Sequence, residues 1–320
     1  MSETARPRTA PAWKTLGVGG AAGLVSCVLL QPMDLLKTRM QQERLPTATT
    51  ATATQRLVRA FHSVVRDNGY GGLWRGTVPT IARNVPGVAA YFYTLNELRW
   101  LVAKWQVPGL STPDNVARTQ RSSTLARLSS TGNILSGALA RVFIGLLLNP
   151  ISIVKARYES SHYSKDAYPT LGASLRSLYR EGGIRGFFRG FSATALRDAP
   201  YAGLYLAFYE QHKHWLGRWT HGESGAWWVV SASGLGAGIL ATVLTHPFDI
   251  LKTRMQTTPE TLLRDPSVAY RPSVFATARH ILQADGLRAF ADGLGLRCAR
   301  KAASSMIGWS IFELGNRWVS

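Results

Sequence analysis

Three arginines at matched positions could together bind an anion inside this chain. Each lies seven residues beyond a glycine that opens a mostly apolar segment. A guanidinium group presents a planar set of N–H donors that matches the two oxygens of a carboxylate. One such arginine could be a surface charge, whereas three at the same place in three segments indicate a shared site. The arginines are Arg83, Arg197 and Arg300, and the glycines are Gly76, Gly190 and Gly293.

Asp198 adds a negative charge beside the second of these arginines. An amino-acid zwitterion carries an ammonium as well as a carboxylate, and its ammonium needs an anionic partner. Neighbouring residues on a helix point about 100° apart, so Arg197 and Asp198 could hold opposite ends of a very small solute. In the alternative interpretation, Asp198 only neutralises Arg197 or Lys301. The residue types leave both roles open.

The segments that carry the arginines are typical of long helices, which we expect at Gly76–Lys104, Gly190–Leu216 and Gly293–Trp318. Seven residues of α-helix advance about 10 Å, which places each arginine well inside the helical body. Charged side chains within a bilayer are costly and normally face a water-filled cavity. The sequence therefore predicts that the three arginines face a central aqueous path.

A charged tag occurs three times and divides the chain into related thirds. Each copy starts with a proline and has lysine as its sixth and arginine as its eighth residue. The prolines, Pro32, Pro150 and Pro247, lie 118 and 97 residues apart (150 − 32 and 247 − 150), which suits three homologous units better than a solenoid. We expect these units to form a closed ring with the functional site on its axis. Within one structural domain, the predicted parts are repeats at 1–105, 126–218 and 219–320 and a linker at 106–125.

Uncharged stretches ahead of the tags are long enough to cross a bilayer. Leu16–Met33 and Ala226–Phe248 carry no charge when His246 is neutral, and Arg127–Lys155 is interrupted only by Arg141. A helix needs about 20 apolar residues to span the hydrocarbon core. We expect each stretch to form the first helix of its third and to end at the tag.

The overall composition favours a membrane protein in an anionic environment. Lys and Arg exceed Asp and Glu by 19, the chain has ten Trp, and 46% of its residues are hydrophobic. Excess positive charge suits acidic lipids or nucleic acid, and Trp gathers at headgroup level. A basic helical nucleic-acid binder would explain the charge but not the three spans, so we expect no nucleic-acid partner. Because His, Cys and Ser form no recurring catalytic arrangement, we expect neither an enzyme nor a bound cofactor or metal.

Short amphipathic segments between the paired helices could contact lipid headgroups. In two thirds, an aromatic residue and an arginine (Arg75 and Arg189) stand just before the following helix. Free N–H groups at a helix N-terminus beside such residues suit a phospholipid phosphate, and simple turn chemistry is the alternative. The last third has Asp292 instead, which argues against lipid there. The segments are Gln55–Asp67, Pro169–Glu181 and Pro272–Asp285.

The three tags, each followed by a glycine-containing turn and a second helix, resemble the mitochondrial carrier family over nearly the whole chain. The resemblance implies an all-α membrane protein with six transmembrane helices in three pseudo-symmetric pairs and short surface helices on the matrix side. It also implies a multi-pass protein of the mitochondrial inner membrane that moves a solute by alternating access. We expect a monomer that binds membrane lipid, with cardiolipin as its structural lipid.

In that family, charges of the tags form a ring of ion pairs that closes the matrix end of the cavity. Ser152 stands where the third acid would be, which leaves Lys252 without its family partner and predicts that this gate opens more easily. The implied pairs are Asp34 with Lys155 and Asp249 with Lys37. The residues at the place of the family's bracing glutamines, nine positions after each proline, are Gln41, Glu159 and Gln256.

At the opposite end, the family uses an aromatic-acid-x-x-base motif that this chain keeps in part. The middle third has Glu210 and Lys213, the last third keeps the acid Glu313, and the first third keeps the base Arg99. The resemblance implies at most one clean pair, Glu313 with Arg99 or Lys213, plus Glu210 with another base. We therefore expect a weak outer gate.

The middle repeat's second helix indicates the substrate class. Arg197-Asp198 resembles the amino-acid carriers of the family, and the string from Gly186 to Tyr205 resembles members that import glycine into the matrix for 5-aminolevulinate and haem synthesis. Another small amino acid or a keto acid is the alternative substrate. Because glycine has no side chain to recognise, its selection would depend on a narrow cavity that excludes larger solutes. The residues expected to narrow it are Tyr201, Tyr205, and Pro86 or Pro200.

Overall fold

The computed structural model is helical throughout the residues that it describes. These are residues 20, 23–42, 52–105, 107–110, 128–163, 170–219, 227–258 and 273–319. Within these ranges the regular elements are α-helices and short 3-10 helices, with no β-strand. The expected all-α class is thus confirmed. Of the predicted linker 106–125, only 107–110 is described.

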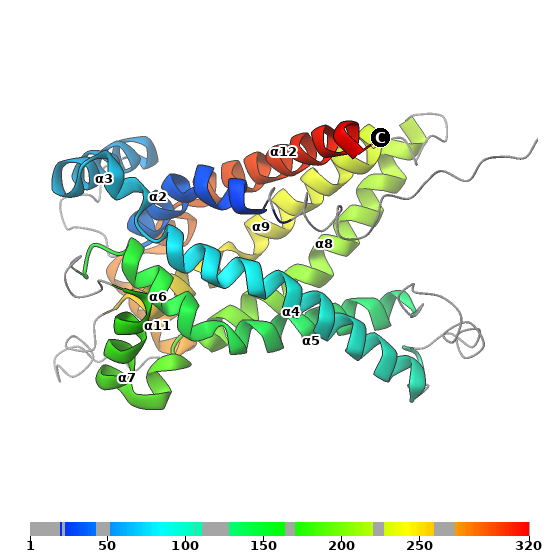
Figure 1. The fold of residues 1–320 in the computed structure, drawn as a ribbon, viewed down its shortest axis with the longest axis horizontal. Coiled ribbons are helices and arrows are strands. Elements are labelled where there is room, and N and C mark those ends of the chain that lie inside the picture. The colour runs from blue at the N-terminus through cyan, green and yellow to red at the C-terminus, as the bar shows by residue number, and fades with distance from the viewer. Residues whose placement is uncertain are drawn as a thin grey trace, which may run out of the picture.

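Long helices run side by side along the molecule and shorter helices gather at one end (Figure 1). The helices that surround the centre are α2 (Gln31–Gln41), α4 (Thr77–Lys104), α5 (Ser130–Leu147), α8 (Phe191–Trp219), α9 (Trp227–Thr257) and α12 (Leu294–Val319). α4 packs on α5, α5 on α8, α8 on α9, α9 on α12, and α12 on α2. The Thr80 hydroxyl of α4 donates a 3.0 Å hydrogen bond to Gln31 Oε1 of α2, which closes this circle of contacts.

The second helices lie where the sequence predicts them. The first helices of the first two thirds end just before the tag, as expected, whereas that of the last third continues through it. α4, α8 and α12 each begin one residue after the expected glycine. The chain is helical at 23–29, turns at Leu30, and resumes as α2. α5 and α6 (Asn149–Glu159) meet at Leu148 with a bend of 66°, whereas α9 passes through Pro247. Because proline removes a backbone donor and crowds the preceding turn, both interruptions fall two residues before a proline.

Among the described helices, α9 is by itself long and apolar enough to cross a membrane, over Trp228–Thr257 with a mean hydropathy of 1.6. The bent pair of α5 and α6 meets the same criterion when both are taken as one span. The stretch expected at Leu16–Met33 lies partly outside the described residues.

Three shorter helices lie at the tag end (Figure 1): α3 (Ala53–Asn68), α7 (Leu171–Phe187) and α11 (Val274–Ala284). Thr52, Thr170 and Ser273 cap their N-termini, because each hydroxyl oxygen accepts a hydrogen bond from the backbone N–H three residues on. α3 therefore begins two residues before the expected Gln55. α7 continues beyond the expected end at Glu181, across a kink at Gly183.

Each short helix packs on its tag through an equivalent apolar cluster. The fourth residue of each tag is completely buried, and it shares its cluster with a buried residue of α3, α7 or α11. These apolar clusters lie at the tag end and repeat once per third. The side chains on the axis of the molecule are instead mostly polar. The pairs are Leu35 with Val64, Ile153 with Leu178, and Ile250 with Ile281.

The residue before each tag proline holds the turn that starts the following long helix. Its side chain donates a hydrogen bond to the carbonyl of the residue that precedes a left-handed glycine. Three different residue types therefore satisfy the same backbone acceptor in the three thirds. The hydrogen bonds run from Gln31 to Arg75 O (3.0 Å), from Asn149 to Arg189 O (3.4 Å) and from His246 to Asp292 O (3.1 Å).

The glycine of this turn in the middle third provides a test of the frame. Gly190 has a φ of +69°, and a Cβ there would lie 3.0 Å from Gln256 Cγ. The left-handed region costs an L-residue about 1–2 kcal/mol, so Gly190→Ala should lower the melting temperature of the detergent-purified protein. Gly172→Ala is the matched control, because a Cβ on Gly172 of α7 meets no atom within 4 Å. Equal melting temperatures for the two variants would contradict this role of the turn.

Candidate functional site

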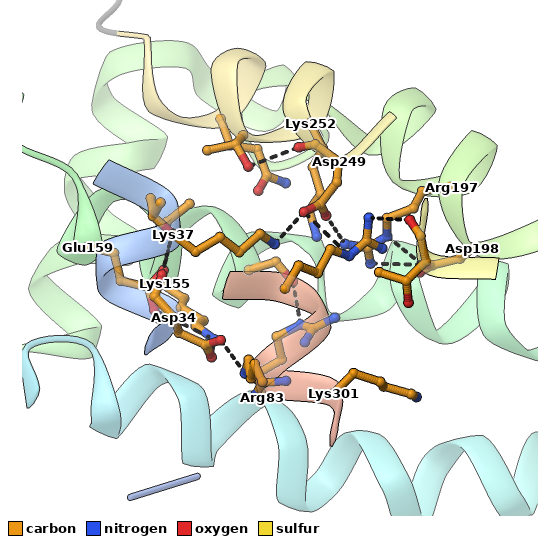
Figure 2. A pocket seen from close by; sticks show the side chains of 18 of the residues that line it. Asp34, Lys37, Arg83, Lys155, Glu159, Arg197, Asp198, Asp249, Lys252 and Lys301 are labelled. Atoms are coloured by element: carbon orange, nitrogen blue, oxygen red, sulfur yellow. Dashed lines mark hydrogen bonds and ion pairs between the residues drawn. The ribbon is translucent and has the colours of Figure 1, made fainter. Parts of the chain in front are cut away.

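A polar cavity of about 350 Å³ lies on the axis, between α2, α4, α5, α6, α8, α9 and α12 (Figure 2). Arg83, Arg197, Asp198 and Arg300 all line it, so the structure brings these four sequence-predicted residues together. Among the described residues, its lining has nine Lys or Arg and four Asp or Glu side chains, a formal excess of five positive charges (9 − 4). The acids are Asp34, Glu159, Asp198 and Asp249.

Asp34 of α2 joins two cations that come from the other two thirds. Its Oδ2 accepts from Lys155 Nζ at 2.8 Å, which is one of the pairs implied by the tags. Its Oδ1 pairs with Arg300 Nε of α12. Lys155 also lies 3.6 Å from Glu159, one turn further along α6. Each oxygen of the Asp34 carboxylate therefore has its own cation.

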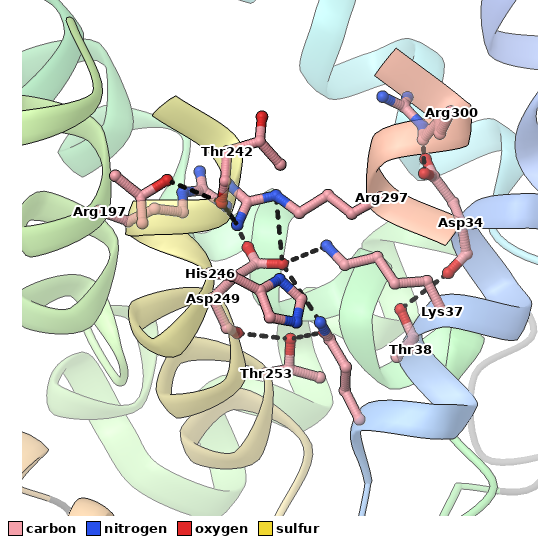
Figure 3. A network of polar contacts seen from close by, with 12 residues as sticks. Asp34, Lys37, Thr38, Arg197, Thr242, His246, Asp249, Thr253, Arg297 and Arg300 are labelled. Carbon is pink, nitrogen blue, oxygen red and sulfur yellow. Dashed lines mark hydrogen bonds and ion pairs between the residues drawn. The ribbon is translucent and has the colours of Figure 1, made fainter. Parts of the chain in front are cut away.

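Asp249 of α9 is surrounded in the same manner (Figure 3). Its Oδ2 pairs with Lys37 Nζ, the second implied pair, and its Oδ1 accepts from Arg197 Nη1 at 2.8 Å. Arg297 Nε lies 3.8 Å from Oδ2, and Gln41 Nε2 donates to the same oxygen at 3.4 Å. The carboxylate is only 2% exposed. Buried in this way, it needs these cations for its charge to be tolerated.

The corresponding place in the middle tag holds an uncharged side chain. Ser152 Oγ accepts a hydrogen bond from Arg83 Nε at 2.7 Å. Lys252 lines the same cavity, and no carboxylate of the described residues lies within 4.0 Å of its ammonium. Arg83 and Lys252 correspond to the cations that bind an acid in the other two tags, but the middle tag has no acid at this position.

Asp198 neutralises Arg197 in this structure. Arg197 Nε donates to Asp198 Oδ1 at 2.8 Å, so one guanidinium bridges Asp198 and Asp249. Lys301 instead stands over the ring of Tyr201, 5.5 Å from its centroid. Of the three matched arginines, Arg83 is the one whose hydrogen-bond partners among the described residues are neutral, namely Ser152 and Asn84 (3.4 Å).

Two further cations of the cavity were not assigned a role from sequence. Arg297 lies almost one helical turn before Arg300 on α12, and Arg141 interrupts the apolar stretch of α5. The signal for both is a charge inside an otherwise apolar helix, the same signal that identifies the matched arginines. Neither recurs in all three thirds, which is why the repeat does not reveal them.

Three parts of the chain match one family model, described as "Mitochondrial carrier protein", at residues 8–104, 126–219 and 223–320. The chain belongs to the mitochondrial carrier family. Relatives of similar length support this assignment. A protein from Mycosarcoma maydis is 48% identical over 99% of this chain and 88% of its own length. Proteins from Laccaria bicolor and Emericella nidulans are each 40% identical, over 93% and 98% of this chain and 94% of their own lengths. All three are described as "Mitochondrial glycine transporter".

The bracing positions of this carrier resemble the tag acids, because two of them have the same kind of partner and the third differs. Gln41 accepts from Thr253 Oγ1 at 2.8 Å, beside the Asp249 pair. Glu159 accepts from Thr38 Oγ1 at 2.7 Å, beside the Asp34 pair. At the third place the middle tag has alanine instead of threonine, and Gln256 donates to Asn149 Oδ1 at 3.4 Å. The third position thus lacks both its acid and its threonine.

The other end of the carrier has no corresponding network in the described part of the chain. Arg99, Glu210 and Lys213 form no ion pair with described residues, and Glu210 is exposed. The side chain of Glu313 lies outside the described residues. Glu210 therefore has no basic partner among the described residues, and the structure does not describe the pair expected for Glu313.

The turns proposed to contact lipid make contacts within the protein. Arg75 Nη2 donates to Tyr163 O at 2.8 Å, and its burial lowers the pKa of Arg75 from the usual value. Arg189 is buried, and Asp292 in the last third accepts from Arg56 Nη2 at 2.5 Å. Contact with lipid at the first two turns stays a prediction.

Removing the carboxylate of Asp249 tests the energetic importance of its ion pairs. Asp249→Asn removes the negative charge between Lys37 and Arg197 and leaves Arg197 with Asp198 alone, and breaking a buried pair in this way costs about 3–5 kcal/mol. The melting temperature of the detergent-purified carrier should fall strongly. Asp67→Asn is the control: Asp67 pairs with Arg66 at 3.2 Å on the exposed face of α3, where solvent screens the interaction, so its loss should leave the melting temperature unchanged. A small, equal effect of both substitutions would refute this assignment.

Proposed function

We propose that this carrier imports glycine across the mitochondrial inner membrane into the matrix, where it supplies 5-aminolevulinate and haem synthesis. The observation that carries the proposal is the convergence of Arg83, Arg197, Asp198 and Arg300 on one axial cavity. The description of the full-length relatives as glycine transporters gives the substrate. As a member of its family, the chain is a multi-pass protein of that membrane.

The architecture that fits this function has six transmembrane helices in three pseudo-symmetric pairs, with α3, α7 and α11 on the matrix surface. Support comes from the circle of packed helices and from the apolar cluster that repeats in each third. The repeats occupy 1–105, 126–218 and 219–320, joined by the linker 106–125. A single chain encloses the cavity, so the carrier acts as a monomer, with cardiolipin as its structural lipid.

Substrate binding uses both signs of charge in the cavity. The matched arginines attract the carboxylate of the amino acid, and Asp198 attracts its ammonium. Asp198 Oδ1 is occupied by Arg197, which leaves the other carboxylate oxygen for the solute. The volume of about 350 Å³ corresponds to about twelve water molecules at ~30 Å³ each, so charge placement contributes more to selection than size does in this state. Tyr201 lines the cavity, whereas Tyr205, Pro86 and Pro200 are not among its lining residues.

Transport by alternating access requires the two ends of the cavity to open in turn. In this proposal Lys37, Lys155 and the two tag acids form the matrix gate, which the Lys155–Asp34 and Lys37–Asp249 ion pairs support. Lys252 forms no ion pair with the described carboxylates, which lowers the barrier to opening. Arg99, Glu210, Lys213 and Glu313 act at the opposite end, where the outer gate is weak.

A keto acid is the second candidate substrate, and the excess of five positive charges around the cavity favours it. Such a solute is a net anion, whereas glycine is neutral overall. Competition in proteoliposomes distinguishes the two: unlabelled glycine should suppress uptake of radiolabelled glycine, and serine or a keto acid should suppress it far less.

Substitution of the central arginine tests the substrate site. Arg197→Ala removes the guanidinium that bridges Asp198 and Asp249, so uptake of radiolabelled glycine into proteoliposomes should fall near background. Arg218→Ala is the control, because Arg218 lies on the exposed end of the same helix and bonds only to His214 among the described residues. Glycine flux in Arg197→Ala equal to that of Arg218→Ala would exclude the proposed site.

A further inference from the structure

We propose that Lys252 and Arg83, which line the axial cavity together with Ser152, form the binding site for the carboxylate of the transported solute. This inference rests on the proposed function and makes it more specific, because it separates one of the matched arginines from the other two. In effect, the solute supplies the carboxylate that the middle tag lacks. The name "Ser152 corner" is used below for Ser152, Lys252 and Arg83.

Asp34 and Asp249, each with the two cations that bind it, provide the template for this site. Each of these sets is called a complete corner below. In each, one tag acid accepts from a tag lysine with Oδ2 and from a matched arginine with Oδ1. At Asp34 the two cations are Lys155 and Arg300, and at Asp249 they are Lys37 and Arg197. The same frame therefore builds a two-oxygen carboxylate site twice, with one cation for each oxygen.

The origins of the residues follow one rule around the axis. The acid, the lysine and the arginine of a corner always come from three different thirds. For Asp34 they come from α2, α6 and α12, and for Asp249 from α9, α2 and α8. Applied to the middle tag, the rule selects Ser152 of α6, Lys252 of α9 and Arg83 of α4.

The Ser152 corner has the matched arginine in the expected place. Arg83 Nε lies 2.7 Å from Ser152 Oγ, just as the matched arginines of the other corners contact the acid at this tag position. Lys252 lines the same cavity, and Arg83 is among the charges that act on it, together with Arg197, Asp198 and Asp249. Serine carries a hydroxyl where aspartate carries the larger carboxylate, and Ser152 itself lines the cavity.

The electrostatics of this corner favour an anion. Arg197 and Arg83 both repel the Lys252 ammonium, and none of the described carboxylates is close enough to form an ion pair with it. Charges partly removed from water are costly unless they are paired and hydrogen-bonded. A bound carboxylate with one oxygen on Lys252 and the other on Arg83 satisfies both cations. Asp198 acts electrostatically on both of them, so the ammonium of a small amino acid has an anion nearby.

The chemistry of the corner would also accept a free anion such as chloride, and the experiment has to distinguish that source from the solute. The decisive variant is Ser152→Asp, which supplies an internal carboxylate that competes with the ligand. Ser152→Asn is its match in size without the charge. Initial rates of radiolabelled glycine uptake into proteoliposomes would be measured over a range of glycine concentrations for both variants and the wild type.

Ser152→Asp should raise the KM for glycine about 10- to 100-fold, the effect expected when a charge-assisted hydrogen bond to a ligand is lost, and Ser152→Asn should raise it much less. Equal KM values for the two variants would overturn the inference. If wild-type protein shows no glycine uptake at all, the proposed function fails, and the corner is judged by the second measurement.

The second measurement is the melting temperature of the detergent-purified carrier with glycine, glycinamide, sodium acetate or sodium chloride. In the wild type, glycine and acetate should raise it and glycinamide, which lacks the carboxylate, should not. In Ser152→Asp the protection should disappear, and the solute-free protein should itself melt at a higher temperature. Protection by glycinamide equal to that by glycine, or protection by chloride equal to that by acetate, would overturn the carboxylate site.

Should Ser152→Asp fail to fold, Lys252→Gln should remove the protection from the cation side, and protection retained in that variant would overturn the inference.

Discussion

Positive charge enclosed at the centre of this carrier has to be matched by carboxylates, and this requirement determines how the three thirds fit together. Asp34 of the first third contacts Lys155 of the second and Arg300 of the last. Asp249 likewise contacts one lysine and one arginine from the other two thirds. Charges in a protein interior are tolerated only when they are paired, so each acid ties three parts of the chain together at one point. The thirds cannot move relative to one another without exchanging these partners.

The frame around these charges is repeated with different side chains. Gln31, Asn149 and His246 share no chemistry except an N–H donor at a suitable reach, and each binds the carbonyl at the start of the next long helix. The apolar clusters beneath the tags repeat in the same way. A structural role can therefore persist through the repeat while the residue type changes.

Much of this arrangement could be predicted from the sequence, because the tags place the three thirds in register. The register gives the shared cavity of the matched arginines, and the family resemblance gives the Asp34–Lys155 pair. The register does not show how far a long side chain extends: counting from the glycines gives the depth of a backbone, not that the guanidinium of Arg197 reaches Asp249. The bend at Leu148 and the unbroken helix through Pro247 were also not predictable, because proline occurs in both tags and the packing around each helix decides the outcome.

Because the middle tag has no acid, one position in the ring of tag charges differs from the other two. A solute can change the balance between two conformations only through contacts that differ between them. Asp34 and Asp249 each supply a carboxylate to their own cations, so these corners respond to a solute indirectly. A carboxylate at Ser152 would instead be held by α4 and α9 together, and its binding free energy would depend directly on how those helices lie relative to each other. The one incomplete corner is thus the place where the presence of a solute can be converted into a movement of the thirds.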